Sequence, residues 1–117
     1  MQLKPETVWL QHWKILRKTL ISLSKHFLSS NPSEAIHYGE QAKGLAQKLN
    51  YHYGLAQAYK RLGLVYYMQG NYLQTLDYWD KSLEEFRKIK DQSGEANIIN
   101  NIGTVYFDQT DETKALE

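Results

Sequence analysis

The feature that most constrains how this chain can fold is a segment that is written twice, forty residues apart. Shifting the sequence by forty positions aligns identical residues without a gap: Gly54 with Gly94, Ala56 with Ala96, Gly63 with Gly103, Val65 with Val105 and Tyr66 with Tyr106. Other pairs exchange like for like, as Leu62 and Ile102 do. Repetition at a period of about 20 to 50 residues is typical of solenoids, in which neighbouring units bury each other's apolar faces.

Each copy has the periodicity of α-helices. Between 72 and 89 the large apolar residues recur in steps of three and four: Tyr72, Leu76, Trp79, Leu83 and Phe86. The same stepping elsewhere predicts helices over 5–29, 32–49, 53–69, 72–89 and 92–109, and a last helix that begins near Glu112. The predicted boundary residues are Asn31, Asn71 and Asp111 as N-caps, Pro32 in a first turn, and Gly70 at a helix end.

These residues resemble the tetratricopeptide repeat family, in which helix A carries an aromatic residue, Leu-Gly and Tyr, and helix B carries small residues and an aromatic residue. The matching positions are Tyr59, Leu62, Gly63, Tyr66, Gly70, Tyr72, Thr75, Trp79 and Ser82, and then Ile99, Ile102, Gly103, Tyr106 and Ala115. The period is forty here, against about 34 residues in the common repeat. Thr110 and Glu112 stand where Gly and an aromatic residue are usual.

The resemblance implies an all-α fold: a right-handed α-solenoid of antiparallel helix pairs with about 2.5 to 3 repeats in a single domain. Its parts are an atypical first helix pair over 5–49, a second repeat over 53–89 and a truncated third repeat over 92–117. The small residues are expected to allow close helix packing, and two aromatic residues to fill the space between the helices. The small residues are Gly63, Gly103, Thr75, Ser82 and Ala115, and the aromatic residues are Tyr66 and Trp79. A HEAT-like array also has a period near forty, but the Leu-Gly-x-x-Tyr spacing argues against it.

Composition excludes several functional classes. The 117 residues include no Cys, which rules out disulfides, thiolate metal sites and a cysteine nucleophile. A net charge of +1 argues against a nucleic-acid partner, because phosphate contacts need clustered cations. Trp9, Trp13 and Leu16 lie on a basic amphipathic segment that we interpret as packing on the next helix, although a membrane-surface or calmodulin-like role is the alternative. We expect no membrane partner and a cytoplasmic protein.

Motifs for catalysis and cofactors are also missing. The sequence has no phosphate-binding glycine loop, no HExxH, no GxSxG and no EF-hand loop, so we expect no enzyme activity, cofactor or metal. His37 and His52 flank one helix and could converge in space as metal ligands, but histidines on helix surfaces are common and we expect no metal there. An acidic helix face formed by Asp77, Asp80, Glu84 and Glu85 is interpreted as solvated, because Lys81 and Arg87 lie among the carboxylates.

The resemblance places a peptide-binding groove on the concave side of the A helices. The residues on that face are Gln57, Lys60, Arg61, Leu64 and Tyr67 in one repeat and Asn97, Asn100, Asn101, Thr104 and Asp108 in the next. An Asn amide can donate and accept hydrogen bonds together, which suits an extended peptide main chain. Lys60 and Arg61 would attract an acidic side chain or a C-terminal carboxylate.

The sequence therefore predicts a non-enzymatic interaction module that binds a peptide segment of a protein partner. The alternative is a sensory or regulatory region of a longer signalling enzyme, such as a nucleotide cyclase or a histidine kinase, or a self-associating scaffold fragment. The apolar stripe of Ile99, Ile102 and Tyr106 has only one turn of predicted helix after it. A homo-oligomer formed through this open C-terminal end is thus a further expectation.

Overall fold

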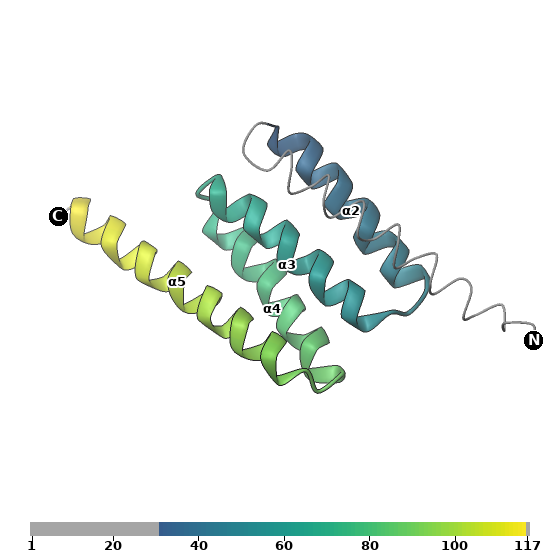
Figure 1. Ribbon diagram of the computed structural model, residues 1–117. Helices are drawn as coiled ribbons and strands as arrows, with labels where there is room; N and C mark the ends of the chain where they lie inside the picture. Colours follow the sequence, from purple (N-terminus) through teal and green to yellow (C-terminus); the bar gives the residue numbers. More distant parts are fainter. Residues whose placement is uncertain (1–30, 117) are drawn as a thin grey trace, which may run out of the picture.

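Four consecutive helices make up the described part of the chain. The computed structural model describes residues 31–116, and over 111–116 it describes the helix without its side chains. The helices are α2 (Pro32–Lys48), α3 (His52–Met68), α4 (Tyr72–Lys88) and α5 (Gln92–Leu116). Each packs antiparallel on the next, so that α2 and α5 lie at opposite ends of the stack (Figure 1). The predicted all-α stack of helix pairs is confirmed, with about two repeats in the described residues; the predicted helix over 5–29 lies outside them.

Side-chain caps fix where three of the helices begin. The Asn31 side chain accepts a hydrogen bond from the Glu34 backbone N–H at 3.3 Å, and Pro32 occupies the first turn. The Asn71 side chain accepts from the Gln74 N–H in the same way at 3.3 Å. Both caps were predicted, and each satisfies a backbone donor that the first turn leaves unpaired. Asp91 caps α5 through the Gly94 N–H at 3.0 Å.

One backbone turn, repeated every twenty residues, ends the first three helices. Asn50, Gly70 and Lys90 have φ of 51°, 76° and 57°, in the left-handed region. The residue after each donates its N–H back into the helix: Tyr51 to the Ala46 carbonyl, Asn71 to Tyr66 and Asp91 to Phe86, at 2.9 to 3.0 Å. This is the hydrogen-bond pattern of a Schellman motif. The sequence predicted only the Gly70 turn.

The predicted end of the last long helix is wrong. We expected this helix to end near 109 and Asp111 to cap a new one, but α5 continues without a break to Leu116. Thr110, which lies twenty residues after Lys90, stays helical and its hydroxyl donates to the Tyr106 carbonyl at 3.0 Å. A β-branched residue is disfavoured in the left-handed turn that ends the other helices, and the i−4 hydrogen bond keeps Thr110 in the helix.

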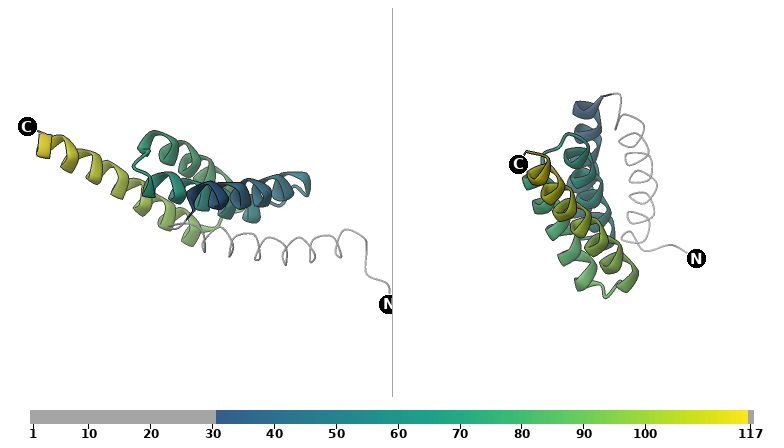
Figure 2. Two further views of the ribbon diagram at one scale, coloured as in Figure 1. Left: turned by 90° about the horizontal axis from the view of Figure 1, so that it is seen from above. Right: turned by 90° about the vertical axis from the view of Figure 1, so that its left-hand side faces the viewer.

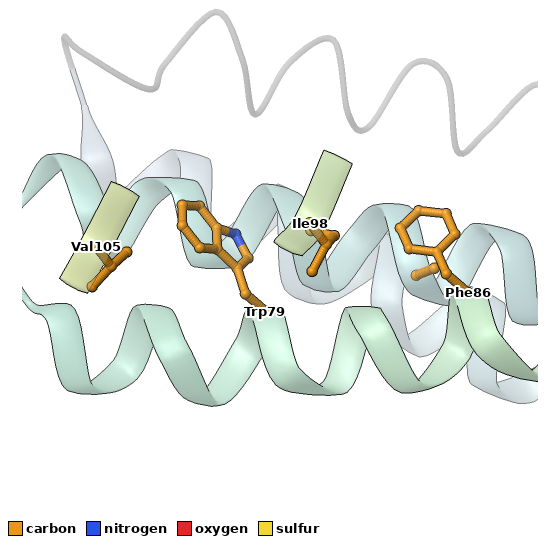
Figure 3. Packing of buried hydrophobic residues seen from close by; sticks show 5 residues of the cluster. Trp79, Phe86, Ile98 and Val105 are labelled. Carbon is orange, nitrogen blue, oxygen red and sulfur yellow. The ribbon is translucent and has the colours of Figure 1, made fainter. Parts of the chain in front are cut away.

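The main core lies where α3, α4 and α5 meet. Trp79 and Phe86 of α4 point between the helices, and Ile98 and Val105 of α5 pack against them (Figure 3). Trp79 is 2% exposed and Phe86 1% exposed, so each contributes about 2 to 3 kcal/mol of burial free energy. Small buried alanines, Ala35, Ala42 and Ala46, line α2.

Gly63 allows α4 to approach α3, as predicted. A Cβ placed on Gly63 would lie 2.3 Å from two atoms of the Trp79 indole. Thr75 and Ser82 are fully buried, and the Ser82 hydroxyl donates to the Ala56 carbonyl at 2.7 Å. The same expectation is wrong for Gly103, because a Cβ there meets nothing within 4 Å.

Candidate functional site

Contrary to expectation, the predicted binding residues of α3 do not all face away from α4, because Tyr67 packs on Trp79 and Tyr72 of that helix. The Trp79 indole N–H donates to the Lys60 carbonyl at 3.0 Å, which fixes where α4 crosses α3. Gln57, Arg61 and Leu64 are separated by three and four residues and so share one face, with Lys60 at its edge beside α4. Gln57, Lys60 and Arg61 are half-buried. We call these three residues, together with Asn97, Asn100, Asn101 and Thr104 of α5, the polar face.

Lys60 and Arg61 are two cations without an anionic partner among the described residues. Burial lowers the pKa of Lys60, and the charge of Arg61 lowers it further. Burial also lowers the pKa of Arg61, whose buried Nε has no hydrogen-bond partner. Elsewhere in the described chain, Lys43, Lys81, Arg87 and Lys88 each reach a carboxylate within 3.2 Å, and Lys48 and Lys90 form no such pair but are exposed to solvent. The partly desolvated pair therefore offers unused hydrogen-bond donors and positive charge to an incoming anion.

Two of the predicted binding residues are instead joined to each other. The Tyr67 hydroxyl donates to the Asp108 carboxylate, which ties α3 to α5. This hydrogen bond, with some burial, raises the pKa of Tyr67 to about 12. The Tyr67 ring also packs on Trp79 at 5.8 Å and on Tyr72 at 5.8 Å. Tyr67 and Asp108 thus hold the two A helices in register beside the polar face, and Leu64 packs against the core.

The α5 part of the polar face consists of uncharged groups. Asn97, Asn100 and Thr104 are exposed, and Asn101 is half-buried. The Thr104 hydroxyl donates to the Asn100 carbonyl at 3.1 Å within the helix. Within the described residues, the three Asn side chains make no hydrogen bond, so each can donate to and accept from a ligand.

One acidic side chain that we predicted to lie in solvent is buried. Glu85, predicted on a solvated acidic face, is 7% exposed. Its carboxylate contacts His52 Nδ1 at 2.6 Å and Lys88 Nζ at 3.0 Å, which joins the start of α3 to the end of α4. The Lys88 contact could be read from its spacing of three residues, but the His52 contact spans 33 residues and leaves no local signal.

The two histidines considered as metal ligands do not share a site. His37 contacts Gln41 at 2.9 Å, whereas His52 contacts Glu85. Among residues 31–110, no group of three or more His, Cys, Asp or Glu residues is arranged to hold a metal ion. None of the described helices is long and apolar enough to cross a membrane.

The family of the chain follows from the repeat and its packing. The family model described as tetratricopeptide repeat matches residues 54–117, which is more than half of the sequence and includes nearly all of α3 and the whole of α4 and α5. The match is to a repeat domain, and no catalytic domain was identified. Searches of curated proteins and of solved structures gave no significant match. The paired helices, the glycine under Trp79 and the family match together identify the chain as a member of the tetratricopeptide repeat family, whose domains generally act as protein–protein interaction modules.

Proposed function

We propose that the chain is a non-enzymatic module that binds an extended, acidic peptide segment of a protein partner along the polar face. The observation that supports this most strongly is the Lys60–Arg61 pair, which is half-buried and has no carboxylate partner among the described residues. Leaving buried donors unpaired has a free-energy cost, and a carboxylate from a ligand would remove it.

The α5 residues supply the second half of the proposed site. Asn97 and Asn101 lie four residues apart and therefore on the same side of α5, with Thr104 three residues further along. Amide side chains on that spacing can hold the N–H and C=O groups of an extended peptide. Arg61 and Asn101 occupy equivalent positions forty residues apart, so a peptide crossing α3 and α5 would contact both.

A labelled-peptide titration tests the proposal. The probes are fluorescein-labelled synthetic peptides of about eight residues, with Asp and Glu next to a free C-terminal carboxylate, together with amide-capped and neutral versions. We expect the double variant Arg61→Ala/Asn101→Ala to bind the acidic probe about ten- to a hundred-fold more weakly in fluorescence anisotropy, because a charge-assisted hydrogen bond and an amide contact are lost. Added salt should weaken the wild-type complex.

Arg87→Ala is the matched control. Arg87 is also an arginine, but it lies on α4, is 60% exposed at the side chain and pairs with Glu95 at 3.1 Å. This variant should bind the acidic probe like the wild type. Unchanged affinity in Arg61→Ala/Asn101→Ala, or equal binding of the neutral and acidic probes, would contradict the proposed site.

A further inference from the structure

One side of α5 carries large apolar side chains in solvent. Ile99 is 50% exposed, Tyr106 57% and Phe107 67%, and the Cβ position of Gly103 between them faces empty space. With Ala96, which is also exposed, these residues form a surface that we call the α5 face. It lies at the end of the helix stack, where the C-terminal half of α5 extends beyond the other helices (Figure 2).

The repeat shows that this surface has the form of a helix-packing surface. The α3 residues forty positions earlier are covered by α4: Gly63 by the Trp79 ring, Tyr66 by Tyr78 at 5.6 Å, and Tyr67 by Trp79. The α5 face presents the same pattern of a central glycine flanked by large side chains, with no described helix on it. A surface of this kind takes another helix, which can approach closely at the glycine.

The middle of the α5 face carries no charge, which allows an identical surface to occupy it. From Ala96 to Phe107 the sequence contains no charged residue, so the central part of the contact brings no like charges together, and acids of the two copies (Glu95 and Asp111) meet only at its ends. The acids that border this stretch are already engaged in their own chain. Glu95 pairs with Arg87 at 3.1 Å, and Asp108 accepts the hydrogen bond from Tyr67.

The order of residues along the α5 face is also self-complementary. In an antiparallel pair with a two-fold axis at Gly103, each residue meets the one equally far on the other side of Gly103. Ile99 then lies opposite Phe107, and Ala96 opposite Thr110. The glycines meet at the crossing, where the two backbones come closest. From this we propose that two copies of the chain associate antiparallel through their α5 faces, crossing at Gly103.

The available area suits a reversible dimer. With about 200 Å² for a large side chain, the exposed fractions of Ile99, Tyr106 and Phe107 give roughly 350 Å² of apolar surface per copy. The two copies together bury about 700 Å² from these side chains, and Ala96, Gly103 and the flanking polar groups add to this. Stable interfaces begin near 1,200 Å² in total. The association should therefore depend on concentration.

Sedimentation equilibrium of the 117-residue chain, from about 1 μM to about 500 μM, tests the proposal. The mean mass should rise towards twice the monomer mass. Phe107→Glu should shift the midpoint at least about ten-fold to higher concentration, because it places a charge opposite Ile99 of the other copy. Leu73→Glu is the matched control: Leu73 is 81% exposed but lies on α4, and its replacement should leave the midpoint unchanged.

Gly103→Leu separates association from folding. In the single chain the new Cβ meets no atom within 4 Å on an exposed helix surface, and leucine favours a helix more than glycine does, so far-ultraviolet circular dichroism should show an intact fold. At the helix crossing the same side chain would keep the two backbones apart. We expect Gly103→Leu to be folded and monomeric at concentrations where the wild type is a dimer.

A crosslink checks the two-fold axis directly, because the natural chain has no cysteine. Helices about 8 to 10 Å apart bring the Cα atoms at a crossing to within about 5 Å, a distance that a disulfide can span. Gly103→Cys should therefore give a disulfide-linked dimer under mild oxidation, and Leu73→Cys should not.

Three results would overturn the proposal: a monomer at every concentration, a dimer that survives Gly103→Leu, or equal crosslinking of the two cysteine variants. If the chain is a monomer at every concentration, the helix that covers the α5 face would have to come from another protein or from a following segment. Phe107→Glu should bind the acidic peptide probe normally, so failure of this proposal is distinguishable from failure of the proposed function.

Discussion

The two glycines of the repeat should respond in opposite ways to the same substitution. In Gly63→Ala the added methyl group would lie 2.3 Å from the Trp79 indole, which is 2% exposed and cannot move into solvent. Overpacking of this kind costs about 1 to 3 kcal/mol, and displacing the ring weakens its hydrogen bond to the Lys60 carbonyl by about 1 kcal/mol. The gain in helix propensity offsets about 1 kcal/mol of this. We therefore expect Gly63→Ala to lower the free energy of unfolding by about 2 kcal/mol.

Gly103→Ala keeps the propensity gain without the clash, because no atom lies within 4 Å of the new Cβ. It should stabilise the fold by about 1 kcal/mol. At about 4 °C per kcal/mol, the Tm should fall by about 8 °C in Gly63→Ala and rise by about 4 °C in Gly103→Ala. Thermal unfolding followed by circular dichroism, at a concentration where the chain is monomeric, measures both. Shifts of the same sign and size would refute the packing assigned to Gly63.

Three further predictions concern single contacts. Ser82→Ala leaves the buried Ala56 carbonyl without the hydroxyl that donates to it at 2.7 Å, and should lower the urea-unfolding free energy by about 1 to 2 kcal/mol. Gly70→Ala should lower the free energy of unfolding by about 1 kcal/mol. The added methyl group would meet no atom within 4 Å, so the cost comes from the backbone strain of an alanine at a φ of 76°. The folded state raises the pKa of Tyr67 to about 12, so the stability due to its bond to Asp108 is complete below about pH 10 and is lost as the pH rises towards 12. In Tyr67→Phe the free energy of unfolding should therefore change less with pH over that range. The ultraviolet difference spectrum should also lose one tyrosine that titrates late.

Local signals explain why much of the fold could be predicted. The caps at Asn31 and Asn71 and the left-handed turn at Gly70 depend on residues within one helical turn, so they can be predicted from the local sequence. The burial of Trp79 followed from its place on an apolar stripe, which period counting detects.

The expectations that failed depend on distant contacts or on the lack of a neighbouring helix. Gly63 and Gly103 stand at equivalent positions, but among the described helices one lies over Gly63 and none over Gly103, and no local pattern distinguishes the two glycines. Glu85 was predicted to face solvent because its sequence neighbours are charged, whereas its burial depends on His52, 33 residues away. Lys90 adopts a left-handed turn without being Gly or Asn, because the packing of the next helix overrides the residue's own preference.

The polar face and the α5 face meet at one residue, and this allows the two proposals to be tested against each other. Asn100 corresponds to Lys60, whose carbonyl accepts the Trp79 hydrogen bond, so a helix on the α5 face would reach Asn100 as α4 reaches Lys60. In the proposed dimer Asn100 lies opposite Tyr106 of the other copy. Asn101 lies one residue further round the helix, is half-buried and points away from that contact.

Asn100→Ala should therefore weaken both peptide binding and association, each by about three- to ten-fold, the effect of one lost hydrogen bond. Asn101→Ala should weaken peptide binding alone. Anisotropy and sedimentation measured on the same preparations compare the two variants. If Asn101→Ala dimerises as poorly as Asn100→Ala, the dimer contact includes more residues than the α5 face as defined here. It would then extend across the polar face, and the second copy would compete with the peptide.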